Sequence, residues 1–580
     1  MASLSQLIAK PTTVCLSSPR RSSGGLRPRR ATAQRVSCAS SRGERSEPDA
    51  PKHDRRDVLL GLGALGASAS ATLMSARRAA ADPVATPDIS TCGLTDLPPG
   101  ANVLTCCPPP SNALPVDFAP PDAASTPLRT RPAAHSVTAD YVAKFNAGIA
   151  AMKALPRARR PAQLRGAGER ALRLLRRVVQ PRGVPRDGAP DLYFFERILG
   201  SLIGDPSFGI PFWNWDTPDG MRMPAMYADQ SSQLFDPRRD GRHAPPKLID
   251  LDYNGGREPR FTYSQQIDRN LRVMYRQMVS LSPTPSLFFG SAYRAGDDPN
   301  QGPGPVENIP HGPVHIWCGD PRQPAREDMG NFYSAGNDPI FYAHHANIDR
   351  MWSVWKGLDA RRHTDLTDPD WLGASFLFYD EEPKPVRVRV RDVLDTGRLR
   401  YRYQDVPLPW REARPTVTRR AGSLLAPAAQ AAGGATRKAG GFPITLDEAT
   451  SVTVKRPVAG KRSKAEKASR EEVLVIDDIE VGRDVAAKFD VFVNAEDHGA
   501  VGSGGRELAG SFVNVPHRHG HGHAHVHGKG RGIKTTLRLA MNEQLEDLKA
   551  EGDESVEATL VPRQGKGEVK VGGVRIELID

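Results

Sequence analysis

Two stretches, Glu307-Asn-Ile-Pro-His-Gly-Pro-Val-His-Ile316 and Asn337-Asp-Pro-Ile-Phe-Tyr-Ala-His-His-Ala-Asn-Ile-Asp-Arg-Met-Trp352, decide the fold of this 580-residue chain. In the first stretch His311 and His315 stand four residues apart, so a helix would carry both imidazoles on one face. Proline is tolerated in the first helical turn, because its missing N–H would have no partner there. The spacing therefore predicts two imidazoles directed at one point.

The second stretch predicts another helix. Asp338 suits the N-cap and Pro339 suits the first helical position. Apolar residues stand four positions before His345 and three and seven positions after it, at Phe341, Ile348 and Trp352. His345 is therefore expected on the buried side of the helix. His344 is almost as well flanked, so the spacing alone leaves both histidines open as the partner of the first pair.

These histidines together predict a metal site. A single buried histidine is usually a hydrogen-bonded core residue, and one His-x-x-x-His pair often arises by chance. Two imidazoles on one helix face, with a third on a second apolar helix, are more specific. The motifs offer no partnering Cys or carboxylate, and all-imidazole ligation suits copper, zinc or iron, with copper as the first choice.

The strings HGPVH and DPIFYAHHANIDRMW resemble the second copper-binding motif of the type-3 copper proteins, and specifically that of the plant polyphenol oxidases, which are catechol oxidases and tyrosinases. The resemblance implies that His311, His315 and His345 are ligands of the second copper. It also implies that His344 lies beside these ligands without binding the metal.

The same resemblance implies roles for five neighbouring residues. Glu307 matches the acid that holds a water near the phenol, and Asn308 is its neighbour. Phe332 matches the aromatic residue that covers the copper. Gly312 and Ile316 match positions that line the substrate entrance.

The resemblance implies a fold and a function for most of the chain. The expected fold is a mainly α-helical catalytic domain with a four-helix-bundle dicopper core, followed by a C-terminal β-sandwich domain. The expected activity is oxidation of o-diphenols to o-quinones with reduction of O₂ to water, and monophenol hydroxylation is left open. The partners are then a phenolic small molecule and O₂, and the C-terminal domain acts as an intramolecular cap that keeps the enzyme latent. An oxygen carrier with the same site chemistry is a rival hypothesis, against which the plastid targeting and the cap argue.

The chain divides into five segments by composition and motif. They are a targeting segment (1–81), the copper domain (82–365), a middle segment that closes it (366–410), a linker rich in Ala, Gly, Arg and Pro (411–447), and the C-terminal domain (448–580). Amphipathic helices are expected at 141–155 and 264–281. Apolar runs with a period of two predict strands of a β-sandwich at 452–454, 473–476, 489–493, 511–515, 535–539, 556–561 and 574–579.

Residues 157–191 break the resemblance. They are rich in Arg, Gly and Pro and contain no His or Cys, although the family's first copper triad belongs there. Counting back from Leu192, where the expected sequence LYFFER resumes, places the third ligand of the first copper at Gly188. No first-copper ligand is identifiable, so one copper is predicted for this sequence instead of the family's two. Three explanations stay open: a frameshifted or mis-spliced reading of the gene, a natural inactive relative, and a working one-copper protein.

The N-terminal segment has the composition of an organelle transit peptide, since no acid precedes Glu44. Arg55-Arg56 then precede an apolar run of small residues, and Ala79-Ala80-Ala81 offers a cleavage site. This order predicts a chloroplast protein that a twin-arginine signal sends on to the thylakoid lumen. The apolar run is too short and too rich in Gly and Ala to span a bilayer well, so the mature protein is expected to be soluble.

The formal net charge of +12 does not indicate nucleic-acid binding. Residues 1–56 carry 12 Lys and Arg against 4 acids, and residues 157–191 carry 10 Arg against 3 acids, which together account for the whole excess. No basic face remains that would argue for a nucleic-acid partner.

The remaining motifs concern cysteine and histidine. Cys92, Cys106 and Cys107 lie close together in a Pro-rich segment, which suits disulfides that tie down an irregular arm. By resemblance Cys92 pairs with Cys107, whereas the expected partner of Cys106 is absent. No role is assigned to Cys318. The alternation of His with other residues from His517 to His527 is expected to form a solvated hairpin loop that binds metal adventitiously.

Overall fold

The computed structural model describes residues 83–86, 113–155, 188–256, 261–290, 302–332, 334–416, 436–458, 460–499, 501–502, 504–516 and 532–580. The predicted targeting segment, Cys92 and Cys107 with their predicted pairing, residues 156–187 and the His517–His527 alternation lie outside these described residues. In the part of the chain that is described, every helix falls short, in length or in apolar character, of what a membrane crossing needs.

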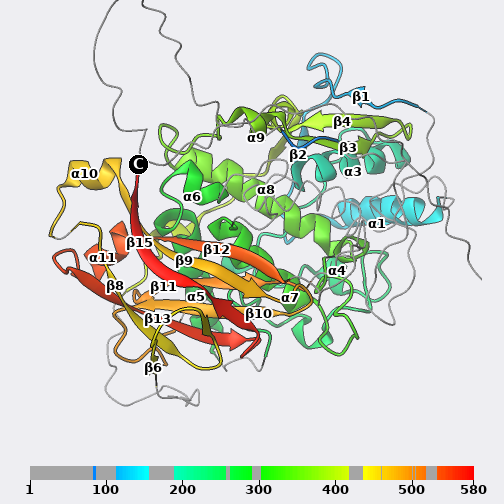
Figure 1. Cartoon of the computed structure of the whole chain (residues 1–580). Coiled ribbons are helices and arrows are strands. Elements are labelled where there is room, and N and C mark those ends of the chain that lie inside the picture. Colours follow the sequence, from blue (N-terminus) through cyan, green and yellow to red (C-terminus); the bar gives the residue numbers. More distant parts are fainter. Residues whose placement is uncertain are drawn as a thin grey trace, which may run out of the picture. The chain divides into compact units, whose positions relative to one another are not determined.

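The helical part of the chain is built around α1 (Ala139–Ala154), α3 (Gly188–Leu202) and α8 (Ile340–Leu358), with α3 packed against both of the others (Figure 1). Helix α1 begins where the Thr138 hydroxyl accepts the N–H of Tyr141 at 3.2 Å. Its buried apolar face comprises Phe145, Ile149 and Met152. Helix α8 is buried on nearly every side and forms the centre of the helical core.

The start of α8 lies one residue later than predicted. The helix begins at Ile340, and Pro339 precedes it. The predicted cap still acts, because the Asp338 carboxylate accepts the N–H of Ile340 at 3.0 Å. The same carboxylate accepts a second hydrogen bond, from the Arg239 guanidinium at 2.7 Å. This ion pair fixes the entry of the chain into α8.

Helix α5 (Tyr263–Tyr275) covers only part of the predicted 264–281 helix. It begins with a capping box, in which the Thr262 hydroxyl and the Gln265 side chain each accept the other residue's backbone N–H. Beyond Tyr275 the chain continues as a wide π turn, Arg276–Ser280. A single π turn is too short for apolar periodicity to reveal it. The short helices are α4 (Ala225–Ala228), α6 (Pro285–Phe289), α7 (Gly312–Cys318) and α9 (Pro369–Gly373).

Two small sheets fasten the middle segment to the helical core. The strands β3 (Ser375–Tyr379) and β4 (Pro385–Arg389) form one sheet with β1 (Val116–Asp117), and β5 (Tyr401–Tyr403) pairs in parallel with β2 (Arg129–Arg131). The Arg131 guanidinium lies 3.8 Å from the ring centroid of Tyr401 and donates to the Glu196 carboxylate of α3 at 2.9 Å. Strand β5, Tyr401–Tyr403, is thereby anchored on the buried ion pair of Arg131 and Glu196.

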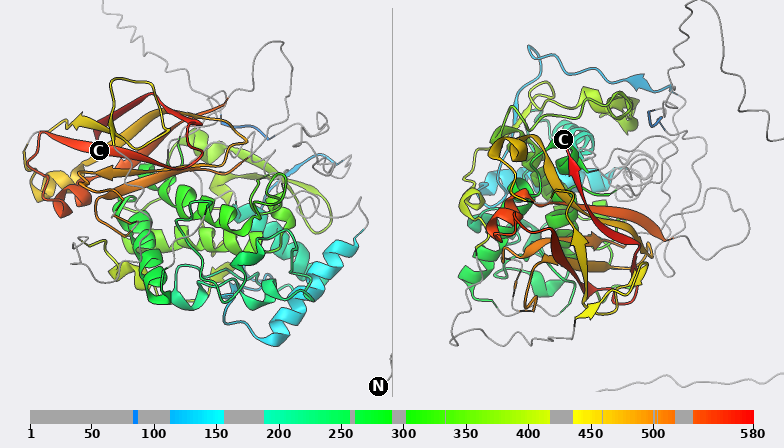
Figure 2. Two further views of the ribbon diagram at one scale, coloured as in Figure 1. Left: turned by 90° about the horizontal axis from the view of Figure 1, so that it is seen from below. Right: turned by 60° about the vertical axis from the view of Figure 1, so that its left-hand side comes forward.

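The C-terminal part is a sandwich of two five-stranded sheets, which confirms the predicted fold class. One sheet has the order β11-β10-β13-β8-β6, and the other has the order β12-β9-β14-β7 with β15 also paired to β9. The strands, coloured yellow to red, gather apart from the cyan and green helices (Figure 2). Their bounds are β6 (Arg437–Lys438), β7 (Ile444–Thr445), β8 (Thr450–Lys455), β9 (Glu471–Val481), β10 (Ala487–Val493), β11 (Leu508–Asn514), β12 (Ile533–Ala540), β13 (Ser555–Gln564), β14 (Val569–Val571) and β15 (Gly573–Ile579). Two short helices, α10 (Lys464–Ser469) and α11 (Asn542–Asp547), join strands of the sandwich.

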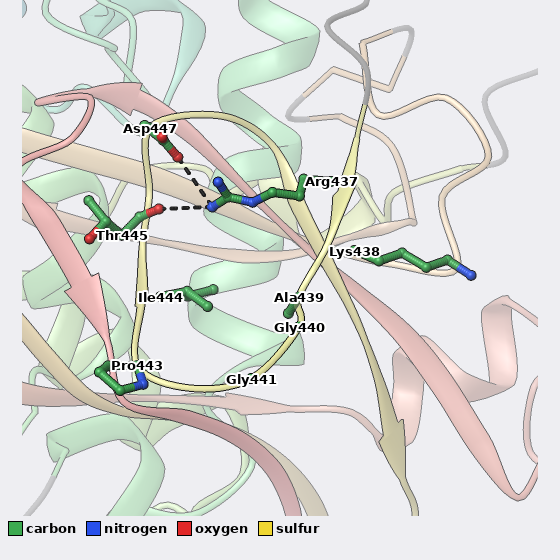
Figure 3. Close-up of a pocket in the computed structure, with 9 residues that line it drawn as sticks. All are labelled: Arg437, Lys438, Ala439, Gly440, Gly441, Pro443, Ile444, Thr445 and Asp447. Carbon is green, nitrogen blue, oxygen red and sulfur yellow. Dashed lines mark hydrogen bonds and ion pairs between the residues drawn. The ribbon is translucent and has the colours of Figure 1, made fainter.

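The strands β6 and β7 lie within the predicted linker range of 411–447. Strand β6 pairs with β8, and β7 pairs with β14. The loop between β6 and β7 is closed by Arg437, whose guanidinium donates to the Thr445 carbonyl and pairs with Asp447, each at 3.2 Å (Figure 3). The sandwich therefore begins before residue 448. Residues 417–435 of the predicted linker lie outside the described part of the chain.

Candidate metal centre

Four histidines meet in the helical core: His311, His315, His344 and His345. Each offers one ring nitrogen, and these nitrogens lie within 4.8 Å of one another. Among the described residues this is the one group of His, Cys, Asp and Glu arranged to hold a metal ion. His311 ends a wide turn (Glu307–His311), His315 lies on α7, and the other two lie on α8. The stretches 307–316 and 337–352 therefore converge, as their histidine spacing predicted.

Backbone carbonyls orient the first two imidazoles. Ile309 is extended (φ −138°, ψ 126°), so the helical turn that carries both histidines starts after it. The Nδ1–H of His311 donates to the Glu307 carbonyl at 3.1 Å, and the Nδ1–H of His315 donates to the Met329 carbonyl at 2.9 Å. A carbonyl can only accept, so each neutral ring carries its proton on Nδ1. Both rings therefore present an Nε2 lone pair to the space between them.

His344 and His345 differ in the nitrogen that they can offer. The Nε2 of His345 lies 3.2 Å from the Nε2 of His315. The Nδ1 of His344 accepts the indole N–H of Trp215 at 3.2 Å, so this neutral ring carries its proton on Nε2. That Nε2 is buried. A protonated nitrogen cannot bind a metal, which favours His345 over His344.

The donor set fits a copper ion in both distance and protonation. Two nitrogens bound to one tetrahedral ion at about 2.0–2.1 Å lie about 3.3 Å apart, close to the 3.2 Å between His315 and His345. Burial lowers the pKa of His311 to about 4 and lowers the pKa of His315 and His345 well below the ordinary value. Metal ligation requires the neutral ring, and burial keeps all three rings neutral at physiological pH.

Aromatic rings close around the cluster. The Phe332 ring stacks on His311 at 5.9 Å between centroids and meets His315 edge-on at 5.1 Å. The Phe341 ring stacks on His345 at 4.0 Å. Phe332 thus lies against two of the four clustered histidines.

Strand β11 and the residues that follow it cover the cluster from the C-terminal domain. The side-chain amide of Asn308 donates to the Ser511 carbonyl and accepts the N–H of Val513 at 2.9 Å. A Cβ atom on Gly312 would lie 3.0 Å from Cγ1 of Val513. Val513 also shares an apolar cluster with Ile316. Both predicted entrance positions, Gly312 and Ile316, are therefore buried under the sandwich.

The region of the expected first copper offers no comparable group in the described residues. The helix α3 begins at Gly188, and His135 and His243 are not part of the histidine cluster. His243 stacks on Trp317 at 4.4 Å. Asp191 is buried at the start of α3, where burial raises its pKa to about 7. Residues 156–187 lie outside the described part of the chain.

Sequence reasoning missed two residues that orient the cluster, Trp215 and Met329. Trp215 lies 129 positions before His344, and Met329 acts through its backbone carbonyl. No local spacing signals either contact.

Cys318 is a buried free thiol, and burial raises its pKa.

Three family models match the chain in the order of its segments. Residues 191–358 match the common central domain of tyrosinase, residues 365–416 the polyphenol oxidase middle domain, and residues 442–578 the chloroplastic polyphenol oxidase C-terminal domain. The tyrosinase match begins only at residue 191, where the stretch without histidine ends.

The chain is similar to its relatives over nearly its whole length. The chloroplastic polyphenol oxidase of Malus domestica is 46% identical over 95% of this chain and 93% of its own length. The latent chloroplastic form of Prunus armeniaca is also 46% identical, over 91% of this chain and 87% of its own length.

Two solved structures share the fold. The structure of latent apple tyrosinase matches with a TM-score of 0.71 at 46% identity, covering 80% of this chain and all of that one. A latent aurone synthase matches with a TM-score of 0.74 at 36% identity, covering 86% of this chain and 99% of that one. The similarity covers the helical core, the middle segment and the sandwich. The chain therefore belongs to the plant polyphenol oxidases of the tyrosinase family, which are oxidoreductases that act on phenols with O₂.

Proposed function

We propose that this protein oxidises o-diphenols to o-quinones, two diphenols being consumed for each O₂ that is reduced to two waters. Within this proposal His311, His315 and His345 hold the second copper, which supplies the electron transfer between phenol and O₂. The observation that carries the assignment is the arrangement of the ring nitrogens. The Nδ1–H groups of His311 and His315 donate to backbone carbonyls, and the Nε2 of His345 lies 3.2 Å from the Nε2 of His315. Trp215 directs the proton of His344 to Nε2 and excludes that ring.

The residues around the cluster would then position the phenol. Glu307 directly precedes Asn308 at the start of the wide turn Glu307–His311 and would hold the water that takes up the phenol proton. Phe332 would limit approach over His311 and His315. Gly312 and Ile316 would shape the entrance once β11 is displaced. The sandwich would thus keep the enzyme latent, as in the relatives named latent.

One specific observation favours a second candidate, an inactive one-copper relative. The described residues contain a single metal-binding group, and residues 157–191 contain no His or Cys. Reduction of O₂ by two electrons calls for two coppers that give one electron each. On this alternative the sequence as it stands binds one copper and oxidises diphenols negligibly.

The cellular site and the covalent links complete the proposal. The relatives of Malus domestica and Prunus armeniaca are named chloroplastic, and we extend this location to the present chain. The twin-arginine pair Arg55-Arg56 supports the thylakoid lumen as the final compartment. The pairing of Cys92 with Cys107 remains a proposal that rests on the resemblance.

The experiment that decides between the two candidates measures quinone formation and copper content together. The protein would be freed of residues 517–527, loaded with copper and assayed with 4-methylcatechol after displacement of the sandwich. Two coppers with turnover establish the oxidase, whereas one copper without turnover establishes the inactive relative. His345→Ala should abolish copper retention, and substitution of the exposed His135 by Ala should leave it unchanged.

A further inference from the structure

Lys488 of β10 crosses from the C-terminal sandwich into the helical part. Its side chain is only 1% exposed. The ammonium donates to the Asp252 carboxylate at 2.7 Å, to the Asp252 carbonyl at 3.0 Å and to the Asn254 side-chain oxygen at 2.6 Å. An ammonium has three N–H donors, so all of them are used by one loop of the helical part.

The loop that receives Lys488 is held in place by its own part of the chain. The N–H of Asp252 donates to the Asp250 carboxylate at 3.0 Å. The guanidinium of Arg269, on α5, donates to the second carboxylate oxygen of Asp252 at 3.2 Å. The Asn270 amide donates to the Ile249 carbonyl at 2.8 Å. The acceptors are therefore arranged by contacts that do not involve the sandwich.

A second carboxylate faces Lys488 from within the sandwich. Asp490 lies two residues further along β10, and its carboxylate is 3.4 Å from the Lys488 ammonium. Arg563 and the Ser511 hydroxyl donate to Asp490 at 2.6 Å and 2.7 Å. Withdrawal of Lys488 would break a buried ion pair and leave Asp252, which is 3% exposed, with Arg269 at 3.2 Å as its remaining cation. Breaking a buried pair in this way is strongly unfavourable.

Other contacts between the two parts surround the same face. The Arg276 guanidinium donates to the Gly505 carbonyl at 2.7 Å, and the Ser280 hydroxyl donates to Glu543 at 2.8 Å. None of these contacts runs through residues 417–435. The described interface is thus made by residues on both sides of this part of the linker.

We propose that Lys488 in the Asp252–Asn254 loop keeps the sandwich docked after the linker has been cut, so that cleavage alone does not expose the metal centre. Withdrawal of Lys488 is then the step that uncovers the histidines. This inference rests on the proposed role of the sandwich as the cover of the metal centre. Its test measures docking and not turnover, so the two proposals can fail separately.

The test places a specific protease site within residues 417–435 of the full chain and follows the two fragments after cleavage by size-exclusion chromatography over a dilution series. The unaltered fragments should co-elute. Lys488→Met, which keeps the length of the side chain, and Asp252→Asn should each raise the dissociation constant about 100-fold or more, because each breaks the buried ion pair that joins the two parts. Lys534→Met is the matched control, since Lys534 pairs with Asp478 on the exposed side of the same sandwich.

Two results would overturn the proposal: separation of the unaltered fragments as soon as the linker is cut, or an unchanged dissociation constant for Lys488→Met and Asp252→Asn. Circular dichroism of each cut protein shows whether the sandwich remains folded. The Asp252→Asn variant leaves every residue of the sandwich intact, so a loss of docking in that variant cannot come from misfolding of β10.

Discussion

His344 and His345 are neighbours in the chain, yet their surroundings give them opposite roles. The indole N–H of Trp215 occupies the Nδ1 of His344, whereas the Nε2 of His345 faces that of His315. The choice between the two rings is thus made by a residue far away in the sequence. Helical spacing does not separate them, since both lie on α8 against the same cluster.

His345→Ala should therefore remove tight copper binding, and His344→Ala should weaken it by only about 10- to 100-fold, the usual effect of losing a residue that orients ligands. The measurement is copper retention during dialysis against a competing chelator, in protein without residues 517–527. Equal losses in the two variants would show that His344 is itself a ligand.

Glu471 provides a prediction on pH. Its carboxylate is buried at the start of β9 and accepts the backbone N–H groups of Met541 and Asn542 at 3.1 Å and 2.7 Å. Burial raises the pKa of Glu471 to about 7. The unfolded chain ionises this group at lower pH than the folded chain does, so its contribution to stability is present below about pH 4.5 and is lost as the pH rises through about 7.

Glu471→Gln keeps an oxygen that can accept both N–H groups but cannot ionise. The variant should have a free energy of unfolding about 2 kcal/mol higher than the unaltered protein at pH 8, and little different at pH 4. Denaturant unfolding at both pH values checks this. A gain of the same size at pH 4 would mean that ionisation is not its cause.

At the scale of elements, local pattern predicted the sandwich well and the contacts between elements poorly. Six of the seven apolar runs lie wholly in strands and the seventh, 511–515, extends one residue beyond β11, because alternation is a property of each strand alone. The helix α8 was predicted to within one residue from Asp338 and Pro339. The position of Lys488 in the Asp252 loop had no such signal, since it depends on how the sandwich packs on the helical part.

The packing of α7 against β11 yields a further prediction. Gly312 has ordinary helical geometry (φ −58°), but a Cβ atom there would lie 3.0 Å from Cγ1 of Val513. Gly312→Ala should therefore weaken docking of the sandwich by about 1 kcal/mol, or about fivefold in the dissociation constant of the cut protein. Adding Val513→Ala should restore docking, because it removes the atom that clashes. Additive losses in the double variant would contradict the steric cause.

At the scale of the whole molecule, the C-terminal sandwich packs beside the histidine cluster through β11. The four clustered histidines, the Phe332 ring against His311 and the interface of Asn308 with β11 are all present. The helices α1 and α3, which flank residues 156–187 in the chain, pack together in the core. The frame that would carry a first triad therefore exists on both sides of the aberrant stretch.

On the second candidate, the inactive one-copper relative, this arrangement predicts that one replacement restores diphenol oxidation. Exchanging residues 156–191 for the corresponding segment of the Malus domestica relative should raise the copper content from one ion to two per chain and produce o-quinone from 4-methylcatechol once the sandwich is displaced. Copper analysis and quinone absorbance check both outcomes, again in protein without residues 517–527. The same exchange in a His345→Ala background is the control and should produce no quinone, because the second copper is then lost. If the unaltered chain already holds two coppers and turns over, its first site uses ligands other than the expected histidine triad, and the second candidate, the inactive one-copper relative, fails.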